Sequence, residues 1–325
     1  MDEYGAAAKA LVERRPSIVR LIGHGSSDAA AAFAVYAFGL FPGWTAVRDS
    51  ISLLVYYDAK VDLADSVVIA LSQSGQTPDV VAYVERARAQ GAWTIALTNE
   101  PESELARAAE TSLPLAAGVE RSVAASKTYL NMLAALALLA GTCAERQQEI
   151  VDALRTVADV LSRSLDSLEQ AVSEVALAFA YVGRMYVIGR GMEISTAREI
   201  ALKLKETCRV AAEPLTATDL VHGPVATLDA LFPVWVIASR DAGLRAVLEA
   251  AERARGANAT LVASGSAAAD VAGAAHVLAV PEAPMPVLAP LLSVVPGQLF
   301  AATLARAKGL DPDHPEGLTK VTLAR

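Results

Sequence analysis

Short, continuous apolar runs alternate along the chain with longer stretches whose apolar positions recur at helical spacing. The clearest run is Val67–Leu71, which is typical of a strand buried on both faces. Alternation of such strands with helices predicts parallel sheets covered on both faces. The first half predicts strands at Ile18–Ile22, Thr45–Val47, Val67–Leu71, Trp93–Leu97 and, at an edge, Thr111–Leu115, and helices at Asp2–Arg14, up to Leu40, up to Gln90, Glu102–Ala109 and Ser122–Ala140. Ser52–Tyr56 has no clear type.

The same pattern recurs in the second half of the chain. Met185–Ile188 with its Gly-Arg-Gly turn repeats the first strand and its Gly-His-Gly turn about 166 positions later. Strands Phe232–Ala238 and Thr260–Val262 and helix Leu244–Arg255 repeat elements of the first half, after a helical connection at Ala144–Ala180. The chain therefore reads as two similar α/β halves.

A hydroxyl-rich loop follows the strand Val67–Leu71. Ser72, Ser74 and Thr77 supply hydroxyls, Gln73 an amide and Gly75 flexibility, and Pro78 suits the first position of the next helix. Ligands of open α/β sheets bind at this edge, and the amides of a helix N-terminus attract phosphate. The loop has no lysine or arginine, which favours a small monophosphate ester over a nucleotide triphosphate. The alternative is an ordinary polar turn. The second half has Ser-Arg-Asp-Ala-Gly there instead, so only one half keeps this cradle.

Composition and charge exclude several classes of protein. The chain has 325 residues, a net charge of −8 and no basic block longer than a pair, so nucleic acid is a poor partner. The chain has no run of 18 or more uncharged apolar residues, so we expect no membrane span. The charged N-terminal stretch lacks the apolar core of a signal peptide, so we expect no export. The two cysteines lie far apart in the sequence, which indicates reduced thiols in a cytoplasmic protein. The four histidines have no metal-ligand spacing, so we expect no metal site.

These features together resemble a tandem sugar isomerase (SIS) domain protein. The first half carries GHGSS after its first strand and SQSGQT after the next central one. The second half carries Glu199–Glu206 (EIALKLKE), then His222-Gly223-Pro224, and Lys320 follows near the end, as in the sugar-phosphate half of glutamine–fructose-6-phosphate aminotransferase. The resemblance implies two flavodoxin-like, doubly wound SIS domains at residues 1–160 and 161–305, with a tail at 306–325 that closes over the site. The first domain would bind phosphate and the second would carry the catalytic glutamate and histidine.

The second-half motif carries the catalytic candidates. Glu199, Lys203 and Glu206 share one helix face by their spacing, a pattern that is otherwise common in solvated salt bridges. Moving a proton between C1 and C2 of an open-chain sugar needs one poised carboxylate, for which we select Glu206, with Lys203 beside it. The resemblance assigns His222 to ring opening in the neighbouring subunit's site, which implies a homodimer. It assigns Lys320 to the lid, where a Schiff base with the sugar is an open alternative.

The resemblance also supplies the substrate-binding residues. Ser27, Ser72, Gln73, Ser74 and Thr77 carry over as ligands of the sugar phosphate, and Glu120 as a ligand of a sugar hydroxyl or the amine. Two departures put the exact sugar in doubt. Ala125 stands where the aminotransferases usually have a serine that contacts substrate, and Glu316 where the tail usually has an arginine. Both Gly-x-Gly turns lack the third glycine of a dinucleotide fingerprint, so we expect no NAD or other cofactor.

The expected function is that of an amino-sugar-phosphate enzyme. Residues 1–20 hold no cysteine nucleophile of a glutaminase domain, so glutamine is not the expected ammonia source within this chain. The first hypothesis is conversion of glucosamine 6-phosphate and water to fructose 6-phosphate and ammonia, or the reverse. A second is a deglycase that cleaves a 6-phosphorylated fructosamine to glucose 6-phosphate and an amine. A third, from a different class, is a non-catalytic SIS module that senses a hexose or hexosamine 6-phosphate.

Overall fold

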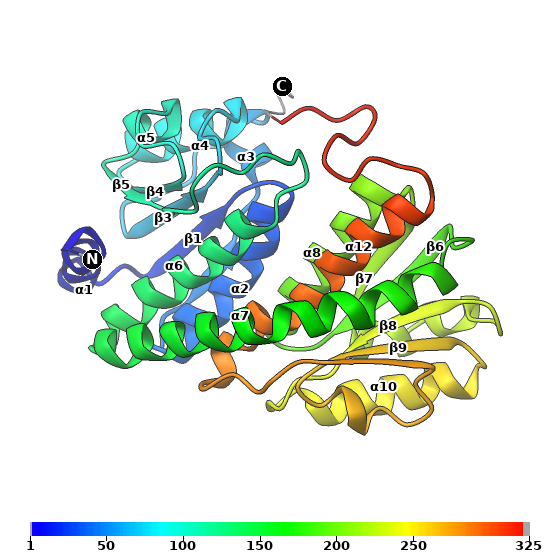
Figure 1. Cartoon of the computed structure of the whole chain (residues 1–325). Coiled ribbons are helices and arrows are strands. Elements are labelled where there is room, and N and C mark those ends of the chain that lie inside the picture. The colour runs from blue at the N-terminus through cyan, green and yellow to red at the C-terminus, as the bar shows by residue number, and fades with distance from the viewer. Residues whose placement is uncertain (1, 321–325) are drawn as a thin grey trace. The chain divides into compact units, whose positions relative to one another are not determined.

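A computed structural model describes residues 2–320, which form two compact units. Unit 1 takes the described residues up to Arg121, those from Ala125 to Asp152, and Thr319 and Lys320. Unit 2 takes Ser122–Ala124 and Ala153–Leu318. Figure 1 labels the helices and strands in chain order.

Unit 1 is a parallel sheet of five strands in the order β2-β1-β3-β4-β5. This is the flavodoxin-like order, in which the chain turns back after β2 and crosses β1 to reach β3. The elements are α1 (Asp2–Arg14), β1 (Ile18–Ile22), α2 (Ser26–Leu40), β2 (Ala46–Arg48), α3 (Ile51–Val55), β3 (Ser66–Leu71), α4 (Pro78–Ala89), β4 (Trp93–Thr98), α5 (Glu104–Ala108), β5 (Thr111–Pro114) and α6 (Lys127–Cys143).

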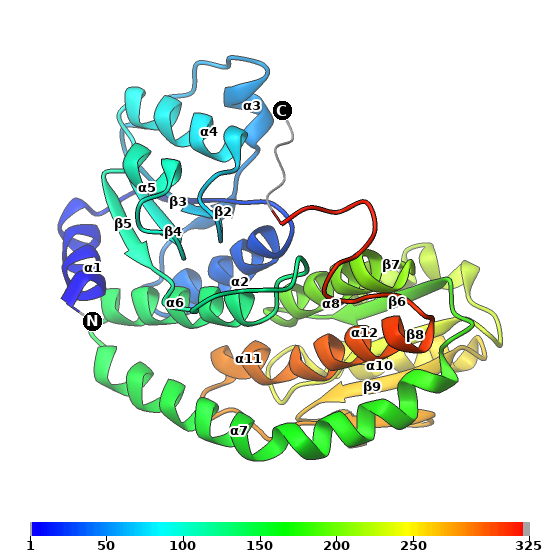
Figure 2. The ribbon, with the colours of Figure 1, turned by 45° about the horizontal axis from the view of Figure 1, so that its top comes forward.

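Helices cover both faces of the unit 1 sheet. Helices α3, α4 and α5 bury their apolar residues against one face, where β3 contributes Val68 and Ala70. Helices α2 and α6 cover the other face, and α1 packs on α6 (Figure 2). Every residue of β3 is buried, as its continuous apolar run predicts. A polar anchor fixes α4 to β1, because Asp49 Oδ2 accepts hydrogen bonds from Tyr83 Oη at 2.6 Å and from Arg20 at 2.7 Å.

Unit 2 repeats this topology. Its sheet has the order β10-β9-β8-β6-β7, which read from the other edge is the same second-first-third-fourth-fifth arrangement as in unit 1. The strands are β6 (Arg184–Gly189), β7 (Ala211–Thr216), β8 (Pro233–Ile237), β9 (Thr260–Gly265) and β10 (His276–Ala279). The helices are α8 (Glu193–Cys208), α9 (Ala217–Val221), α10 (Leu244–Gly256), α11 (Ala289–Ser293) and α12 (Val295–Ala307), with short 3₁₀ turns η1 (Pro224–Thr227), η2 (Ala268–Asp270) and η3 (Pro286–Leu288).

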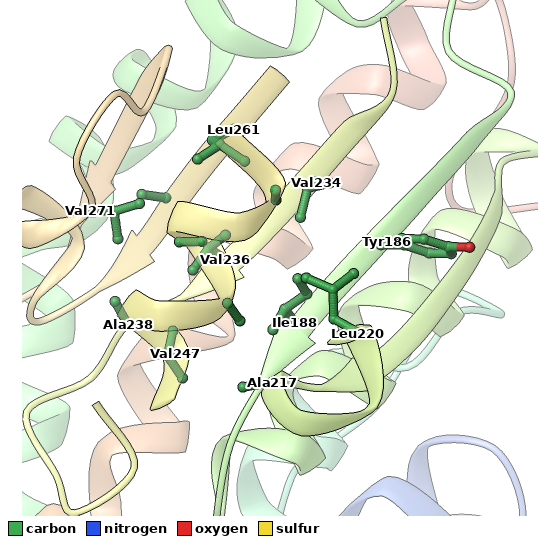
Figure 3. Packing of buried hydrophobic residues seen from close by; sticks show 14 of the residues in the cluster. Tyr186, Ile188, Ala217, Leu220, Val234, Val236, Ala238, Val247, Leu261 and Val271 are labelled. Atoms are coloured by element: carbon green, nitrogen blue, oxygen red, sulfur yellow. The ribbon is translucent and has the colours of Figure 1, made fainter. Parts of the chain in front are cut away.

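The unit 2 core has one layer on each side of its sheet. Figure 3 shows the layer under α9 and α10, where Val234 and Val236 of β8 lie among Ile188, Leu220 and other buried side chains. On the other side α8 packs against α12, and Trp235 stacks edge-on against Phe300 at 4.9 Å. Trp235 Nε1 donates to Ser264 Oγ at 2.8 Å, so the largest buried side chain has its polar atom satisfied.

Two long helical stretches complete the chain. Helix α7 (Gln147–Ala178) runs from unit 1 into unit 2 without interruption. Pro286–Ala307 is long and apolar enough to cross a membrane by length and composition, and 78% of its most apolar window is buried inside the structure. That burial is the property of a core element of the fold.

The predicted α/β fold with two doubly wound sheets is confirmed, and most elements differ from prediction by one or two residues at their ends. The segment Ser52–Tyr56 contains most of helix α3, which ends at Val55 with Tyr56 as its C-cap. The helix predicted over Ser122–Ala140 was wrong at its start, because α6 begins at Lys127. Val123 N instead donates to the Asp313 carbonyl of the C-terminal tail at 3.0 Å, which holds this segment out of the helix.

Candidate active site

The loop after β3 is shaped by hydrogen bonds of its own side chains. Ser72 Oγ accepts from Gly75 N at 3.1 Å and lies 3.3 Å from Thr77 Oγ1. Ser74 Oγ accepts from Gln76 N at 3.3 Å. At the end of the neighbouring strand β4, Thr98 Oγ1 donates to the Gln73 carbonyl at 3.2 Å. These bonds hold three hydroxyls and an amide side chain together at the carboxyl end of the strand.

Gly75 is required where it stands. Its φ is +60°, a conformation that L residues rarely adopt, and a Cβ there would lie 2.1 Å from Ser103 Oγ. The close approach lets Leu105 N donate to the Gly75 carbonyl at 2.9 Å, which ties the loop to α5. The loop conformation is therefore built into the fold rather than left to a ligand.

The N-terminus of α4 faces this loop. Thr77 is its N-cap and Pro78 its first residue, as the sequence predicts, but the Thr77 hydroxyl makes no capping bond to the helix. It is directed to Ser72 instead, which leaves the first-turn amides of α4 without a cap from this side chain. Ser27, in the first turn of α2, is buried, and its hydroxyl donates to the sulfur of Met132 at 3.7 Å.

Four of the predicted residues line one cavity of unit 1. Gln73, Ser74, Glu120 and Lys320 border a space of about 720 Å³. Glu120 is buried, and its Oε2 accepts from the backbone amides of Thr128 at 2.9 Å and Ser126 at 3.2 Å. One carboxylate oxygen thus caps α6, a structural role that the sequence did not indicate. Ala125 is half-buried in the loop before α6 and is not among the residues that line this cavity.

Helix α8 of unit 2 carries the predicted carboxylate and lysine array. Lys203 is 4% exposed and donates to Glu206 Oε2, and its Nζ lies 3.7 Å from Glu199 Oε1. Glu199 is fully buried, whereas the Glu206 side chain is 24% exposed. The face is therefore not a solvated salt-bridge pattern. One buried ammonium is held between an inner carboxylate and an outer one that reaches the surface.

Glu206 opens onto a second cavity, of about 480 Å³, inside unit 2. The other wall comes from the tail, including His314 and Leu318. Glu316, the residue that departs from the aminotransferase pattern, pairs here with Arg209 at the C-terminal end of α8. This exposed ion pair joins the tail to the end of the helix that carries Glu206.

His222 is not among the residues that line either cavity. It is the C-cap of α9, a helix of one turn whose start is fixed by a capping box between Thr216 and Asp219. Gly223 follows with φ +139°, and Pro224 begins η1. This rigid turn presents His222 at the surface of unit 2.

In unit 2, three hydroxyl groups bind a carboxylate of the protein itself, that of Glu193. Glu193 stands where unit 1 has Ser27, and it is 2% exposed. Its carboxylate accepts hydrogen bonds from Ser239 Oγ at 2.5 Å, Thr196 Oγ1 at 2.6 Å and Ser293 Oγ at 2.7 Å. Burial raises the pKa of Glu193, and the three hydroxyls oppose that shift. This internal carboxylate gives a physical reason for the asymmetry that the two loop sequences predict.

Two features of the site escaped prediction from the sequence. Asn99 directly follows β4 and lines the unit 1 cavity, with Nδ2 donating to the Gly118 carbonyl at 2.7 Å. Its position just past a strand end was a usable signal. Glu193 gave no such signal, since an acidic residue in the first turn of a helix is usually solvated.

The two repeated α/β units match a family of sugar isomerase domains. The SIS domain family model matches residues 14–141 and 178–307, one match in each half. The chain belongs to the SIS domain family.

Individual relatives narrow the comparison. The chain is 36% identical over 269 residues to the glutamine–fructose-6-phosphate aminotransferase (isomerizing) of Corynebacterium diphtheriae, covering 78% of this chain and 43% of that protein. It is 33% identical over 321 residues to the enzyme of that name from Thermus thermophilus, covering 96% of this chain and 53% of that protein. The chain thus spans about half the length of the curated relatives it matches.

Solved structures agree on the fold. A Silicibacter pomeroyi DSS-3 protein, provisionally assigned as a phosphosugar isomerase, superposes with a TM-score of 0.82 at 30% identity, covering 96% of this chain and 93% of that one. The C-terminal domain of the Francisella tularensis glucosamine-fructose-6-phosphate aminotransferase superposes with a TM-score of 0.86 at 24% identity, covering 97% and 95%. The second likeness concerns the fold alone.

Proposed function

We propose that the chain is a cytoplasmic, homodimeric enzyme that converts glucosamine 6-phosphate and water to fructose 6-phosphate and ammonia, or runs the reverse reaction. The observation that carries the proposal is the α8 array, in which buried Lys203 is ion-paired to the partly exposed Glu206. A lysine placed this way holds the carboxylate in one orientation. A carboxylate that is oriented by a buried partner and open to a cavity suits the work of a general base.

The proposed chemistry divides between the two units. The loop Ser72–Thr77 and the α4 amides hold the 6-phosphate, with Ser27 behind them. His222, contributed by the neighbouring subunit, passes a proton from O1 to O5 and opens the ring. Glu206 takes the C2 proton and returns it at C1, while O1 gains a proton and the amine nitrogen loses one, which converts the open-chain 2-amino aldose to the 2-imine of the ketose. Water then adds to C2 and ammonia leaves. Lys320, on the tail, closes over the sugar or forms a Schiff base with it.

Two other functions share part of this equipment. A deglycase of 6-phosphorylated fructosamines needs the same phosphate cradle and C1/C2 proton transfer, with an amine leaving from C1. A non-catalytic sensor needs the cradle alone, and the buried lysine between two carboxylates has no evident purpose in it.

A substrate panel separates the three functions. Ammonia and hexose 6-phosphate release would be measured for glucosamine 6-phosphate, for fructosamine 6-phosphates with different amines, and for the unphosphorylated sugars. Ammonia with fructose 6-phosphate supports the deaminase, whereas a free amine with glucose 6-phosphate supports the deglycase. Tight binding of a sugar phosphate without turnover of any member would show that the sensor is correct and that the proposed enzyme is not.

A further inference from the structure

A histidine and an aspartate form a pair at the edge of the proposed phosphate cradle. His24 lies in the Gly-His-Gly turn after β1, and its Nε2 is 2.7 Å from Asp79 Oδ2 in the first turn of α4. Strands β1 and β3 are adjacent and parallel, with Ile22 opposite Ala70, so this turn lies beside the Ser72 loop. The His24 side chain is 55% exposed, while that of Asp79 is 12% exposed.

Asp79 presents an electrostatic problem for a phosphate ligand. Its carboxylate stands on the helix turn whose amides would bind the phosphate, so it repels a dianion there. Its second oxygen, Oδ1, is buried and accepts no hydrogen bond from the described residues. A half-satisfied, mostly buried carboxylate is costly as an anion unless a cation faces it. The partner that the structure provides is the imidazole of His24.

The neighbouring acids are already compensated by arginines. Asp28, in the first turn of α2, is paired with Arg48 of β2 at 2.6 Å. Asp49 is paired with Arg20 of β1 at 2.7 Å and also accepts from Tyr83. Arginine stays charged at every physiological pH, so these pairs keep a constant charge. The partner of Asp79 is instead His24, and histidine is the side chain type whose charge changes between about pH 5 and 8.

We propose that His24 couples a proton to the binding of a dianionic phosphate ester. Protonated His24 neutralises Asp79 and admits the phosphate to the α4 N-terminus, and the bound dianion in turn favours the protonated ring. Binding of the sugar phosphate therefore takes up a proton at His24 and tightens as the pH falls. The inference rests on the proposed function, because it requires that the ester binds at this loop. His24 acts here through Asp79 and is a positioning residue, and the nearby loop has no lysine or arginine to replace it.

Calorimetry of fructose 6-phosphate binding tests the coupling. Titrations at pH 6.5 and 8.5, in buffers with different heats of ionisation, give the affinity and the number of protons taken up. His24→Gln keeps a donor for Asp79 without the charge, and Asp79→Asn removes the charge that needs neutralising. We expect the wild type to take up more protons than His24→Gln and to lose on the order of tenfold more affinity between the two pH values, the size of one charge–charge interaction at a partly exposed site.

The two variants should differ in a way that a merely structural role cannot produce. His24→Gln should bind weakly at both pH values, whereas Asp79→Asn should bind more tightly than the wild type at pH 8.5. Equal affinity and equal proton uptake in the wild type and His24→Gln would overturn the coupling and leave the proposed function intact, as would an Asp79→Asn variant no tighter than the wild type. Absence of fructose 6-phosphate binding by the wild type would overturn the proposed function itself.

Discussion

Removing the internal carboxylate of unit 2 should cost much of that unit's stability. Glu193→Ala deletes the acceptor of three hydroxyl hydrogen bonds and leaves the donors Thr196, Ser239 and Ser293 buried. A buried hydrogen bond to a charged group contributes about 1.5–3 kcal/mol, and the desolvation of the carboxylate, visible in its raised pKa, offsets part of the sum. We therefore expect the free energy of unfolding to fall by about 3–5 kcal/mol, because each buried hydroxyl that loses its acceptor costs about 1–3 kcal/mol.

The variant Glu193→Gln nearly keeps the shape of the side chain and removes its ionisable group, so it tests the contribution of the charge alone. Because the pKa of Glu193 is raised in the folded protein, its protonated form is favoured there, and this stabilisation is present below the unfolded pKa near 4.5 and is lost as the pH rises through the folded pKa. The glutamine variant does not titrate. Its stability relative to the wild type should therefore increase as the pH rises from about 4.5 towards neutrality.

Urea unfolding between pH 4.5 and 8 measures both effects, followed by the fluorescence of Trp235, which lies in unit 2. The other two tryptophans, Trp44 and Trp93, belong to unit 1 and are replaced by phenylalanine in all proteins compared. An alanine variant within 1 kcal/mol of the wild type, or a glutamine variant whose relative stability falls with rising pH, would refute the reasoning.

Three further predictions concern the proposed site. Ser72→Ala and Thr77→Ala should each weaken fructose 6-phosphate binding by about 1–2 kcal/mol in calorimetry, and unphosphorylated glucosamine should bind poorly; equal affinity for the free sugar would contradict the phosphate cradle. Gly75→Ala should lower the thermal midpoint and abolish this binding, since φ of +60° and the contact with a hydroxyl both oppose a Cβ; normal binding would show that the loop can rearrange. Mixing inactive His222→Ala with inactive Glu206→Gln should restore some turnover if subunits share sites, whereas no recovery after verified subunit exchange would place both residues in one chain's site.

Much of the fold could be predicted because local pattern and tertiary structure agree. A strand buried on both faces, such as β3, needs a continuous apolar run. Such runs are easily recognised in the sequence, and they allowed the central strands of both sheets to be predicted. The start of α6 could not be predicted, because the Val123 amide is engaged by the distant Asp313 carbonyl and the helix is capped by Glu120. Asp313 is distant in the sequence and Glu120 lies outside the helix, so the helical pattern of apolar positions marks neither contact.

The candidate site was predictable to a smaller extent. Hydroxyls between a strand and a proline-led helix pointed to the loop by chemistry alone, and helical spacing placed Lys203 and Glu206 on one face. Spacing alone did not show whether this face is solvated. The structure shows that it is not, because Lys203 is buried between two carboxylates. Glu193 and the His24–Asp79 pair depend on contacts between distant elements, which periodicity cannot reveal.

The central claim is that Glu206 performs proton transfer on a phosphorylated amino sugar. Its most direct test compares ammonia release from glucosamine 6-phosphate by the wild type and by Glu206→Gln, with calorimetry of fructose 6-phosphate binding on the same samples. Glutamine nearly keeps the shape of Glu206 and removes the proton acceptor. The account predicts near-normal binding with turnover reduced by at least about 10²-fold, the low end for general base catalysis. Turnover at the wild-type rate in Glu206→Gln would contradict it.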